Sequence, residues 1–338
     1  MAVMKDVAKL AGVSVSTVSF VLNGMAKEHK VADRTAQKVL RAAKQLEYKI
    51  NSSVGNISEE KEWEPTIAFF IPAHSTWIDM SVVYAGINKH IKRTNRTYDV
   101  LLCPYEAGHL LEKINKVQIS GYDSAVVSIE SEKDLADLEK QGMSLPFVLY
   151  DHLSTKHSGV RCKADEAVTQ AVRMIAAKGY KRICILSGND GLEYGDEYLN
   201  LFVKICEENK VKLLKEDFIV TENTMIGGAI AARSILKMEK KPEMIVCMST
   251  SLAFGAIPLL ARNHFLIPRD AELLCFGSSK DAEHIINYIP SLSMIARPID
   301  EITIKAFDMA LQLAEGKEAK QMHYQYSCDL LLHDSLTL

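Results

Sequence analysis

The spacing of hydrophobic and polar residues divides the chain into a short helical segment and a long segment in which strands and helices alternate. Within residues 1–50, hydrophobic residues recur every three to four positions, which places them on one face of a helix. This spacing predicts three short helices. The residues expected to face their common core are Val7, Ala8 and Ala11 in the first, Val18, Val21 and Leu22 in the second, and Val39, Leu40, Ala43 and Leu46 in the third.

Polar residues and glycines mark the ends of these helices. Gly12 ends the first helix, and the Ser14 hydroxyl is placed to accept from free amides of the second helix, about Val15–Leu22. Asn23 and Gly24 stop that helix, and the third spans about Asp33–Glu47. Two short helices joined by a tight turn form a helix-turn-helix unit, whose second helix enters the major groove of DNA.

From Thr66 onward, short β-branched or aromatic runs alternate with amphipathic helices, which predicts an α/β fold with doubly wound parallel sheets. Two such units would face each other across a cleft at the C-terminal ends of their strands. The expected strands are Ile67–Ile71, Asp99–Cys103, Ala125–Ile129, Phe147–Tyr150, Arg182–Ser187, Phe218–Val220, Met244–Met248 and Leu273–Phe276. The expected helices are Ile78–Arg93, Leu135–Gln141, Glu166–Lys178, Tyr198–Glu208, Gly227–Met238, Ser251–Ala261 and Pro298–Gly316.

Composition agrees with a folded protein. The 338 residues are 48% hydrophobic and 25% charged, which excludes disorder as the main state. The longest apolar runs, such as Thr66–Ala73, are too short to span a bilayer, and the N-terminus has no signal-like apolar core. Seven scattered cysteines without a CxxC pair are interpreted as buried free thiols. A cytoplasmic location is therefore expected.

Charge is distributed unevenly. Residues 1–50 contain nine Lys or Arg and four acidic residues, a net charge of +5, whereas the whole chain has a net charge of −3. A basic end on an acidic body is typical of a polyanion-binding head, although solvated lysines on helices would give the same count.

The first fifty residues resemble a known family. The stretches KDVAKLAGVSVSTVSFVLNG and VADRTAQKVLRAAKQLEY are similar to the DNA-binding head of the lactose-repressor/galactose-repressor (LacI/GalR) family of bacterial transcription regulators. The resemblance implies a head over residues 1–50, a hinge over 51–65 and a body over 66–338 that looks like a periplasmic sugar-binding protein. It also implies lobe 1 at about 66–162 and 294–322, and lobe 2 at about 163–293 and 323–338. The chain would cross between the lobes near Lys163, Leu292 and His323.

The resemblance assigns roles within the head. Val15, Ser16 and Phe20 take positions that face base edges. The positions that contact phosphates in the family are Ser14, Thr17, Ser19 and Asn23. Phe20 stands where the family usually has Arg, and Phe cannot pair with guanine but can contact a thymine methyl. Alternatively, Phe20 packs against the loop before the third helix and reads no base.

The hinge YKINSSVGNISEEKEWEP departs from the family pattern. Ile57 takes the position of the leucine that the family wedges into the minor groove. Gly55 weakens the helix expected there, and four glutamates that follow would repel phosphate. A binding mode that depends less on hinge folding is therefore expected.

The cleft departs even more from the sugar-binding members. Of five expected polar anchors only Asp151 matches. The others are replaced by Lys163 with Ala164, by Ser249 with Thr250, by Ser279 followed by Lys280, and by a segment without Arg. Losing these anchors argues against an ordinary free sugar as effector. An anionic small molecule, a protein partner or no effector remain as alternatives.

Several other residues have side chains that could bind a ligand or a metal. His74 and Trp77 follow the first strand, where Trp77 could stack on a ligand or simply cap the lobe interface. The group Asp151, His152, His157 and Cys162 is interpreted as loop residues rather than a metal site, and Tyr194, Asp196 and Tyr198 as surface or packing residues. No catalytic motif is present, so neither an enzyme, a cofactor nor a metal is expected.

The combined prediction is a DNA-binding transcriptional repressor. It would bind a pseudo-palindromic operator as a homodimer, with affinity modulated at the cleft. The expected dimer surface is the helix Ile78–His90, with Val82, Val83 and Ile87 on one face. The C-terminus CDLLLHDSLTL is too short for a coil that would tether tetramers. The alternative is a ligand- or protein-binding module that has lost sequence-specific DNA binding.

Overall fold

The computed structural model describes residues 3–22, 25–26, 29–46, 48, 64–73, 80–117, 121–129, 131–188, 197–316 and 321–337. The chain divides into two compact units, residues 1–63 and residues 64–338, here termed the head and the body. The hydrophobic clusters of the two units contain different residues, so each unit has its own core.

The head consists of three helices, α1 (Met4–Ala11), α2 (Val15–Leu22) and α3 (Asp33–Gln45). Gly12 ends α1 in the left-handed conformation, with φ of 68°, as predicted. The core contains Val7, Ala8, Ala11, Val18, Val21, Val39, Ala42 and Ala43. One interior residue was predicted wrongly: Leu40 is 52% exposed, because the turn of α3 places Ala42 and Ala43 against the other helices instead.

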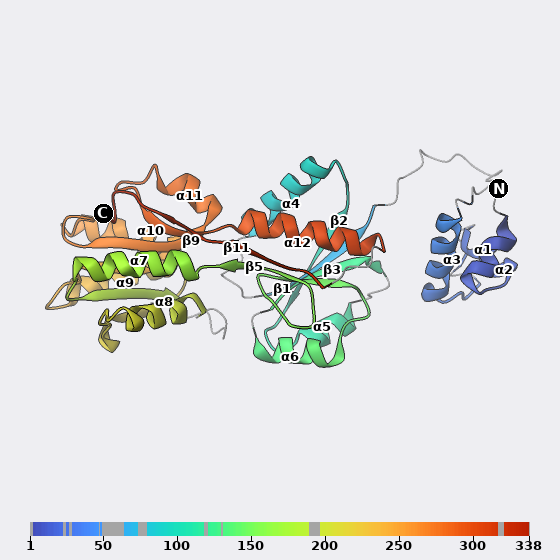
Figure 1. Ribbon diagram of the computed structural model, residues 1–338, viewed down its shortest axis with the longest axis horizontal. Coiled ribbons are helices and arrows are strands. Elements are labelled where there is room, and N and C mark those ends of the chain that lie inside the picture. Colours follow the sequence, from blue (N-terminus) through green and yellow to red (C-terminus); the bar gives the residue numbers. More distant parts are fainter. Residues whose placement is uncertain are drawn as a thin grey trace. The chain divides into compact units, whose positions relative to one another are not determined.

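The body contains two six-stranded sheets, one in each lobe (Figure 1). The lobe 1 sheet is wholly parallel, in the order β11-β5-β4-β3-β1-β2. Its strands are β1 (Thr66–Pro72), β2 (Asp99–Tyr105), β3 (Ser124–Ser128), β4 (Phe147–Tyr150), β5 (Gly159–Lys163) and β11 (His323–Ser327). Helices α4 (Met80–Thr94) and α12 (Ile299–Ala314) cover one face, and α5 (Leu110–Lys116) and α6 (Glu132–Gln141) cover the other (Figure 1).

The lobe 2 sheet has the order β12-β10-β9-β8-β6-β7, with only the short β12 antiparallel. Its strands are β6 (Ile183–Gly188), β7 (Phe218–Thr221), β8 (Met244–Cys247), β9 (Glu272–Ser278), β10 (Ser293–Arg297) and β12 (Asp329–Leu331). Helices α7 (Asp165–Lys178) and α8 (Glu197–Glu208) pack on one face. Helices α9 (Met225–Lys237), α10 (Thr250–Arg262) and α11 (Ser279–Ile285) pack on the other. Covering on both faces explains why central strands such as β8 are buried throughout.

Two predicted lobe boundaries differ from the observed strand pairing. Residues 294–297 were assigned to lobe 1, but β10 pairs with β9 in lobe 2 as far as Arg297. Residues 323–327 were assigned to lobe 2, but β11 pairs with β5 in lobe 1. The chain therefore crosses between the lobes after Lys163, after Arg297 and at Cys328, because hydrogen bonding continues to those points.

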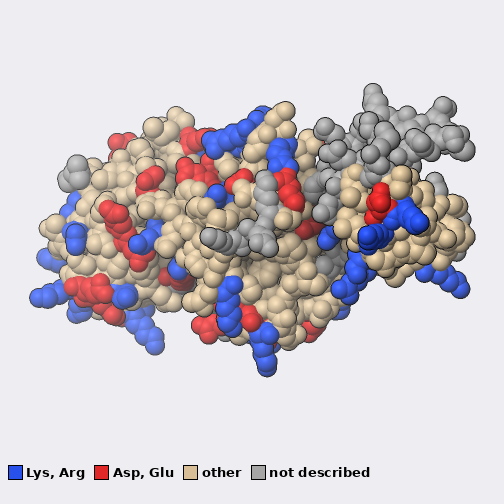
Figure 2. Space-filling model, turned by 45° about the vertical axis from the view of Figure 1, so that its right-hand side comes forward, with Lys and Arg blue, Asp and Glu red and all other residues tan. Residues whose placement is uncertain are grey.

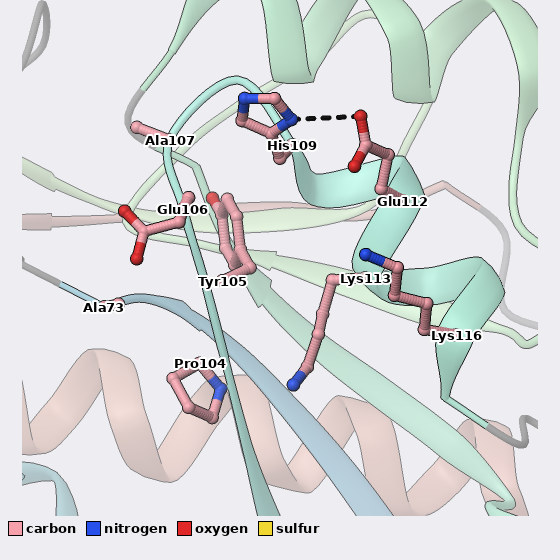
Figure 3. A pocket seen from close by; sticks show the side chains of 9 residues that line it. All are labelled: Ala73, Pro104, Tyr105, Glu106, Ala107, His109, Glu112, Lys113 and Lys116. Atoms are coloured by element: carbon pink, nitrogen blue, oxygen red, sulfur yellow. Dashed lines mark hydrogen bonds and ion pairs between the residues drawn. The ribbon is translucent and has the colours of Figure 1, made fainter.

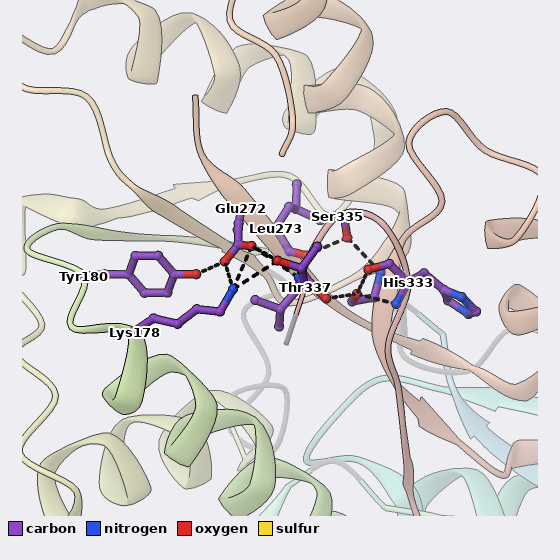
Figure 4. Close-up of polar contacts among 9 residues, drawn as sticks. Lys178, Tyr180, Glu272, Leu273, His333, Ser335 and Thr337 are labelled. Carbon is purple, nitrogen blue, oxygen red and sulfur yellow. Dashed lines mark hydrogen bonds and ion pairs between the residues drawn. The ribbon is translucent and has the colours of Figure 1, made fainter. Parts of the chain in front are cut away.

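The C-terminal segment is held to the lobe 2 sheet by a polar network (Figure 4). The Glu272 carboxylate accepts from Lys178 at 2.6 Å, from Thr337 at 2.8 Å and from the Tyr180 hydroxyl. Although burial acts in the opposite direction, Lys178 and Thr337 lower the pKa of Glu272. The Ser335 hydroxyl donates to the Leu273 carbonyl at 2.7 Å. These hydrogen bonds fix the C-terminal tail to lobe 2.

Candidate nucleic-acid interface and inter-lobe cleft

The N-terminus of α2 carries the predicted cap. The Ser14 Oγ accepts from the Thr17 backbone N–H at 3.1 Å and lies 2.8 Å from the Thr17 Oγ1, which confirms Ser14 as the N-cap. Val18 and Val21 point into the core, so the opposite side of α2 faces outward. Val15 is 43% exposed and Ser16 is also exposed. The short polar and apolar side chains of this side are therefore available to another molecule.

Phe20 lies on the last turn of α2 and is partly exposed. Its ring stacks on the imidazole of His29, with the ring centroids 3.6 Å apart and the planes inclined by 9°. The packing against the loop before α3, one of the two alternatives for Phe20, is thus present. Sequence reasoning missed His29, since nothing in a local pattern links residues nine positions apart in a loop.

Four predicted site residues lie outside the described residues: Asn23 and Ile57 of the DNA-binding set, and His74 and Trp77 of the cleft. The same holds for Tyr194 and Asp196 and for most of the hinge at 51–65.

Asp151, the one matching cleft anchor, is engaged within the protein. Its Oδ2 accepts from the Arg297 guanidinium at 2.6 Å, and its Oδ1 accepts from the Cys162 backbone N–H at 2.8 Å. The guanidinium also lies over the Tyr198 ring, 4.9 Å from its centroid. Asp151, Arg297 and Tyr198 form what we term the crossover cluster, because Arg297 is the last residue before the second crossover.

Burial and the neighbouring charges together determine the charge states of this cluster. It raises the pKa of the Tyr198 hydroxyl well above its usual value, so the phenol is neutral. Burial alone would lower the pKa of Arg297, but the charge of the nearby Asp151 carboxylate counters this, and the pKa of Arg297 is raised well above its usual value. The cluster is therefore a buried ion pair with an aromatic cover.

Ser279 and Lys280, at the start of α11, contact lobe 1. The Ser279 hydroxyl donates to Asp300 Oδ1 of α12 at 2.7 Å, and the Lys280 ammonium donates to the Ser81 hydroxyl of α4 at 2.5 Å. Asp300 also accepts from Lys89 at 3.0 Å. Burial alone would raise the pKa of Asp300, but the hydrogen bonds from Ser279 and Lys89 lower it. A further ion pair joins the lobes elsewhere, between Arg161 of β5 and Glu197 of α8.

The other two predicted cleft residues differ in their surroundings. Ser249 caps α10 by accepting from the Leu252 N–H at 3.3 Å, and it donates to Asn223 at 2.5 Å. The Lys163 side chain is exposed, while its carbonyl accepts from the Cys328 N–H at 2.9 Å. The structure thus brings Ser279, Lys280 and Asp151 into contacts between or beside the lobes, while Ser249 stabilises a helix of lobe 2.

A pocket of about 760 Å³ lies in lobe 1, where β2 ends and α5 begins (Figure 3). It is lined by Lys113 and Lys116 of α5, by His109 and Glu112, and by the end of β2 around Tyr105. His109 and Glu112 are 3.0 Å apart, and this hydrogen bond lowers the pKa of Glu112. The pocket presents both charge signs. Sequence reasoning did not find it, because α5 was not predicted as a helix.

The surface of the body carries charges of both signs. On the face shown in Figure 2, acidic and basic side chains are interspersed over the body, without a large area of one sign.

No helix in the described part of the chain is long and apolar enough to cross a membrane. Within the same residues, no three His, Cys, Asp or Glu side chains gather as a metal site would require.

Comparison with known proteins gives concordant results for both units. Residues 3–51 match the lacI family of bacterial regulatory proteins, and residues 172–336 match the periplasmic binding protein-like domain. The HTH-type transcriptional repressor PurR of Vibrio cholerae is 26% identical, and the alignment covers 99% of this chain and 98% of PurR.

Solved structures show the same fold. A LacI family transcription regulator from Clostridium acetobutylicum is 26% identical with a TM-score of 0.72, over 80% of this chain and 99% of that one. The lac repressor dimer bound to operator and an anti-inducer is 17% identical with a TM-score of 0.68, over 99% of this chain and 98% of that one.

Proposed function

Because this chain belongs to the lacI family of bacterial regulatory proteins, we propose that it represses transcription in the cytoplasm by binding a pseudo-palindromic operator as a homodimer. The observation that carries the proposal is the head itself. Its α2 is capped by Ser14 and buries Val18 and Val21, while Val15 and Ser16 stay exposed on the opposite side. The net charge of +5 in residues 1–50 supplies attraction to phosphate.

In this proposal the exposed side of α2 enters the major groove. Val15 and Ser16 contact base edges, and the hydroxyls of Ser14, Thr17 and Ser19 contact phosphates, with Asn23 beyond the end of α2. Hydroxyls suit this task because they donate to phosphate oxygens at short range.

Dimerisation is supported by exposed hydrophobic residues on the body. The expected surface on α4 needs correction, since Val82 and Val83 are 1% and 0% exposed and face the lobe 1 core. Instead, Tyr84 is 68% exposed on the outward side of α4. Other exposed hydrophobic residues lie on β2, at the edge of the lobe 1 sheet, and on β7 and α9 of lobe 2, namely Leu101, Leu102, Val220, Met225, Ile226 and Ile230. A second copy of the chain would cover them.

Regulation is proposed to act through the contacts between the lobes. Lys280 with Ser81 and Ser279 with Asp300 hold the lobes in one relative position. A small molecule or partner that separates these pairs would shift the population of lobe arrangements, and hence the spacing of two heads in a dimer. Asp151, the one polar anchor that matches the sugar-binding members, is already paired to Arg297. An ordinary free sugar is therefore not the proposed effector.

The test is a selection of the full-length protein on random duplex DNA, followed by titration of the enriched site at two salt concentrations. We expect a two-fold symmetric site whose affinity falls steeply with salt. Val15→Ala and Ser16→Ala should alter the preferred half-site, while the control Lys204→Ala, which removes an exposed charge on α8, should not. Salt-sensitive binding without an enriched site would instead support the alternative of a module that has lost specific DNA binding.

A further inference from the structure

The pocket where β2 ends and α5 begins is formed by lobe 1 alone (Figure 3). The residues that line its volume of about 760 Å³ come from position 73 and from positions 104–116. This volume is typical of sites that enclose a small molecule. The contacts that Ser279 and Lys280 make with lobe 1 use Asp300 and Ser81, which do not line the pocket. A molecule can therefore occupy the pocket without separating the lobes.

The walls of the pocket are held by hydrogen bonds within the protein. Asp134 of α6 is 1% exposed, and its carboxylate accepts from the Gly108 N–H at 2.7 Å and from the Leu110 N–H at 2.9 Å. The Tyr105 hydroxyl donates to the Ser128 carbonyl at 2.7 Å. These bonds fix both the end of β2 and the loop that leads into α5. Little conformational entropy remains to be lost when a ligand binds.

Two lysines supply positive charge to the pocket. Lys113 and Lys116 lie one turn apart on α5, and Figure 3 shows both side chains reaching from α5 into the space beside β2. Among the described residues, neither ammonium group has a hydrogen-bond or ion-pair partner. Lys113 is half-buried, which reduces the screening of its charge by solvent. This pair of ammonium groups favours an anionic group such as a phosphate or a carboxylate.

Two carboxylates limit the charge of the remaining ligand. Glu106 and Glu112 also line the pocket. The His109 Nδ1 lies 3.0 Å from the Glu112 Oε1, and this hydrogen bond lowers the pKa of Glu112. The more distant charges of Lys116 and Lys133 act in the same direction. The carboxylates repel a second anionic group but accept hydrogen bonds from hydroxyls. A ligand with one anionic group and a hydroxylated remainder therefore fits best.

We propose that the lobe 1 pocket is a second small-molecule site, which binds a polyol carrying one phosphate or carboxylate group between Lys113 and Lys116. The proposal goes beyond the proposed function, because binding requires neither DNA nor a change in the contacts between the lobes. The phosphate and the carboxylate share the same anionic chemistry toward the two ammonium groups. Such a ligand is a separate input to the body, distinct from a molecule that acts where the lobes meet.

The first measurement is isothermal titration of the full-length protein at low ionic strength with three matched probes. Sorbitol 6-phosphate carries a phosphate, gluconate carries a carboxylate, and sorbitol carries no charge. We expect at least one charged probe to bind and sorbitol not to bind, and the probe that binds more tightly identifies the anionic group. Absence of binding by both charged probes at millimolar concentration would overturn the proposal, as would equally tight binding of sorbitol.

The second measurement locates the bound probe. The double variant Lys113→Gln with Lys116→Gln should weaken binding at least tenfold, as for the loss of a charge-assisted hydrogen bond. The matched control is Lys140→Gln with Lys204→Gln, which removes two exposed lysines on α6 and α8 and should bind as the wild type does. Unchanged affinity in the pocket variant, or an equal loss in the control, would show that the two pocket lysines do not form the site.

A third variant blocks the pocket without removing a charge. Ala107 lines the pocket and is exposed, so Ala107→Trp places a large side chain there without disturbing the core. We expect this variant to lose binding, and wild-type affinity would place the probe elsewhere in the body. Far-UV circular dichroism and thermal unfolding establish that each variant is folded. Because no DNA is present, failure of these titrations leaves the proposed repressor function untouched, and the operator selection tests that function separately.

Discussion

Replacing Asp151 by Asn tests whether the crossover cluster stabilises the body. The Asp151 and Arg297 side chains are 18% and 10% exposed, and their charged atoms are 2.6 Å apart. Asn keeps an oxygen for the Cys162 N–H and tolerates the left-handed backbone at this position, where φ is 52°. The substitution therefore removes the negative charge and little else.

The magnitude follows from the burial of the remaining charge. Removing one partner of a buried ion pair costs about 3–5 kcal/mol, because the other charge is left uncompensated. Residual exposure, the retained Asn oxygen and the Tyr198 ring over the guanidinium reduce this, so we expect a loss of about 2–3 kcal/mol. For a unit of this size, that lowers the Tm by about 4–12 °C.

The assay is thermal and urea unfolding of the full-length protein at pH 7, completed as a double-mutant cycle with Arg297→Met. The double variant leaves no buried charge, so it should be more stable than the sum of the single losses predicts, by about 2 kcal/mol. An unchanged Tm for Asp151→Asn, or additive losses in the cycle, would refute the idea that this ion pair stabilises the body.

Three further predictions concern single contacts. Ser14→Ala should destabilise the head by about 1 kcal/mol, measured by hydrogen exchange of α2 amides, whereas Ser14→Asn should preserve the cap to Thr17. Gly255→Ala should destabilise lobe 2 by about 1–3 kcal/mol, because the added Cβ would lie 1.9 Å from the Met225 carbonyl oxygen where α9 and α10 pack together. Urea unfolding measures this loss, and an unchanged midpoint would contradict the close packing. His90, Lys305 and Gln312 hold the pKa of Asp308 at about 2, so this carboxylate stabilises the fold above pH 4, and the contribution is lost as the pH falls from about 4 to 2. Acid unfolding of Asp308→Asn should lack that component, which is about 1 kcal/mol after allowance for solvent screening.

The sequence predicted local features well where the determining contacts are short-range. The ends of α1 and α2 depend on Gly12 and Ser14, whose effects act within one turn, and both were predicted correctly. The central strands were found because burial on both faces demands continuous hydrophobic runs. The strands β5, β10, β11 and β12 were missed, since none of them contains more than three hydrophobic residues in a row, although β10 is buried throughout.

The candidate sites were predicted less well, because they depend on contacts between residues that are far apart in the sequence. The sequence does not decide whether Phe20 is free to contact a base or packs against the loop before α3. The answer depends on His29, a loop residue whose ring stacks on Phe20. Periodicity identifies Val82 and Val83 as an apolar side of α4 but does not say what covers it, and the structure buries both residues in the lobe 1 core instead of a dimer surface.

The amino-acid sequence alone determined the class of this protein: a helix-turn-helix head with its caps, followed by an α/β body whose strands alternate with helices. Only the tertiary structure decided what the polar residues of the cleft do. Asp151 meets Arg297 across 146 residues, and Lys280 meets Ser81 across 199. Local propensities act over one or two turns, whereas these pairs form only after two sheets are assembled and the chain has crossed between them.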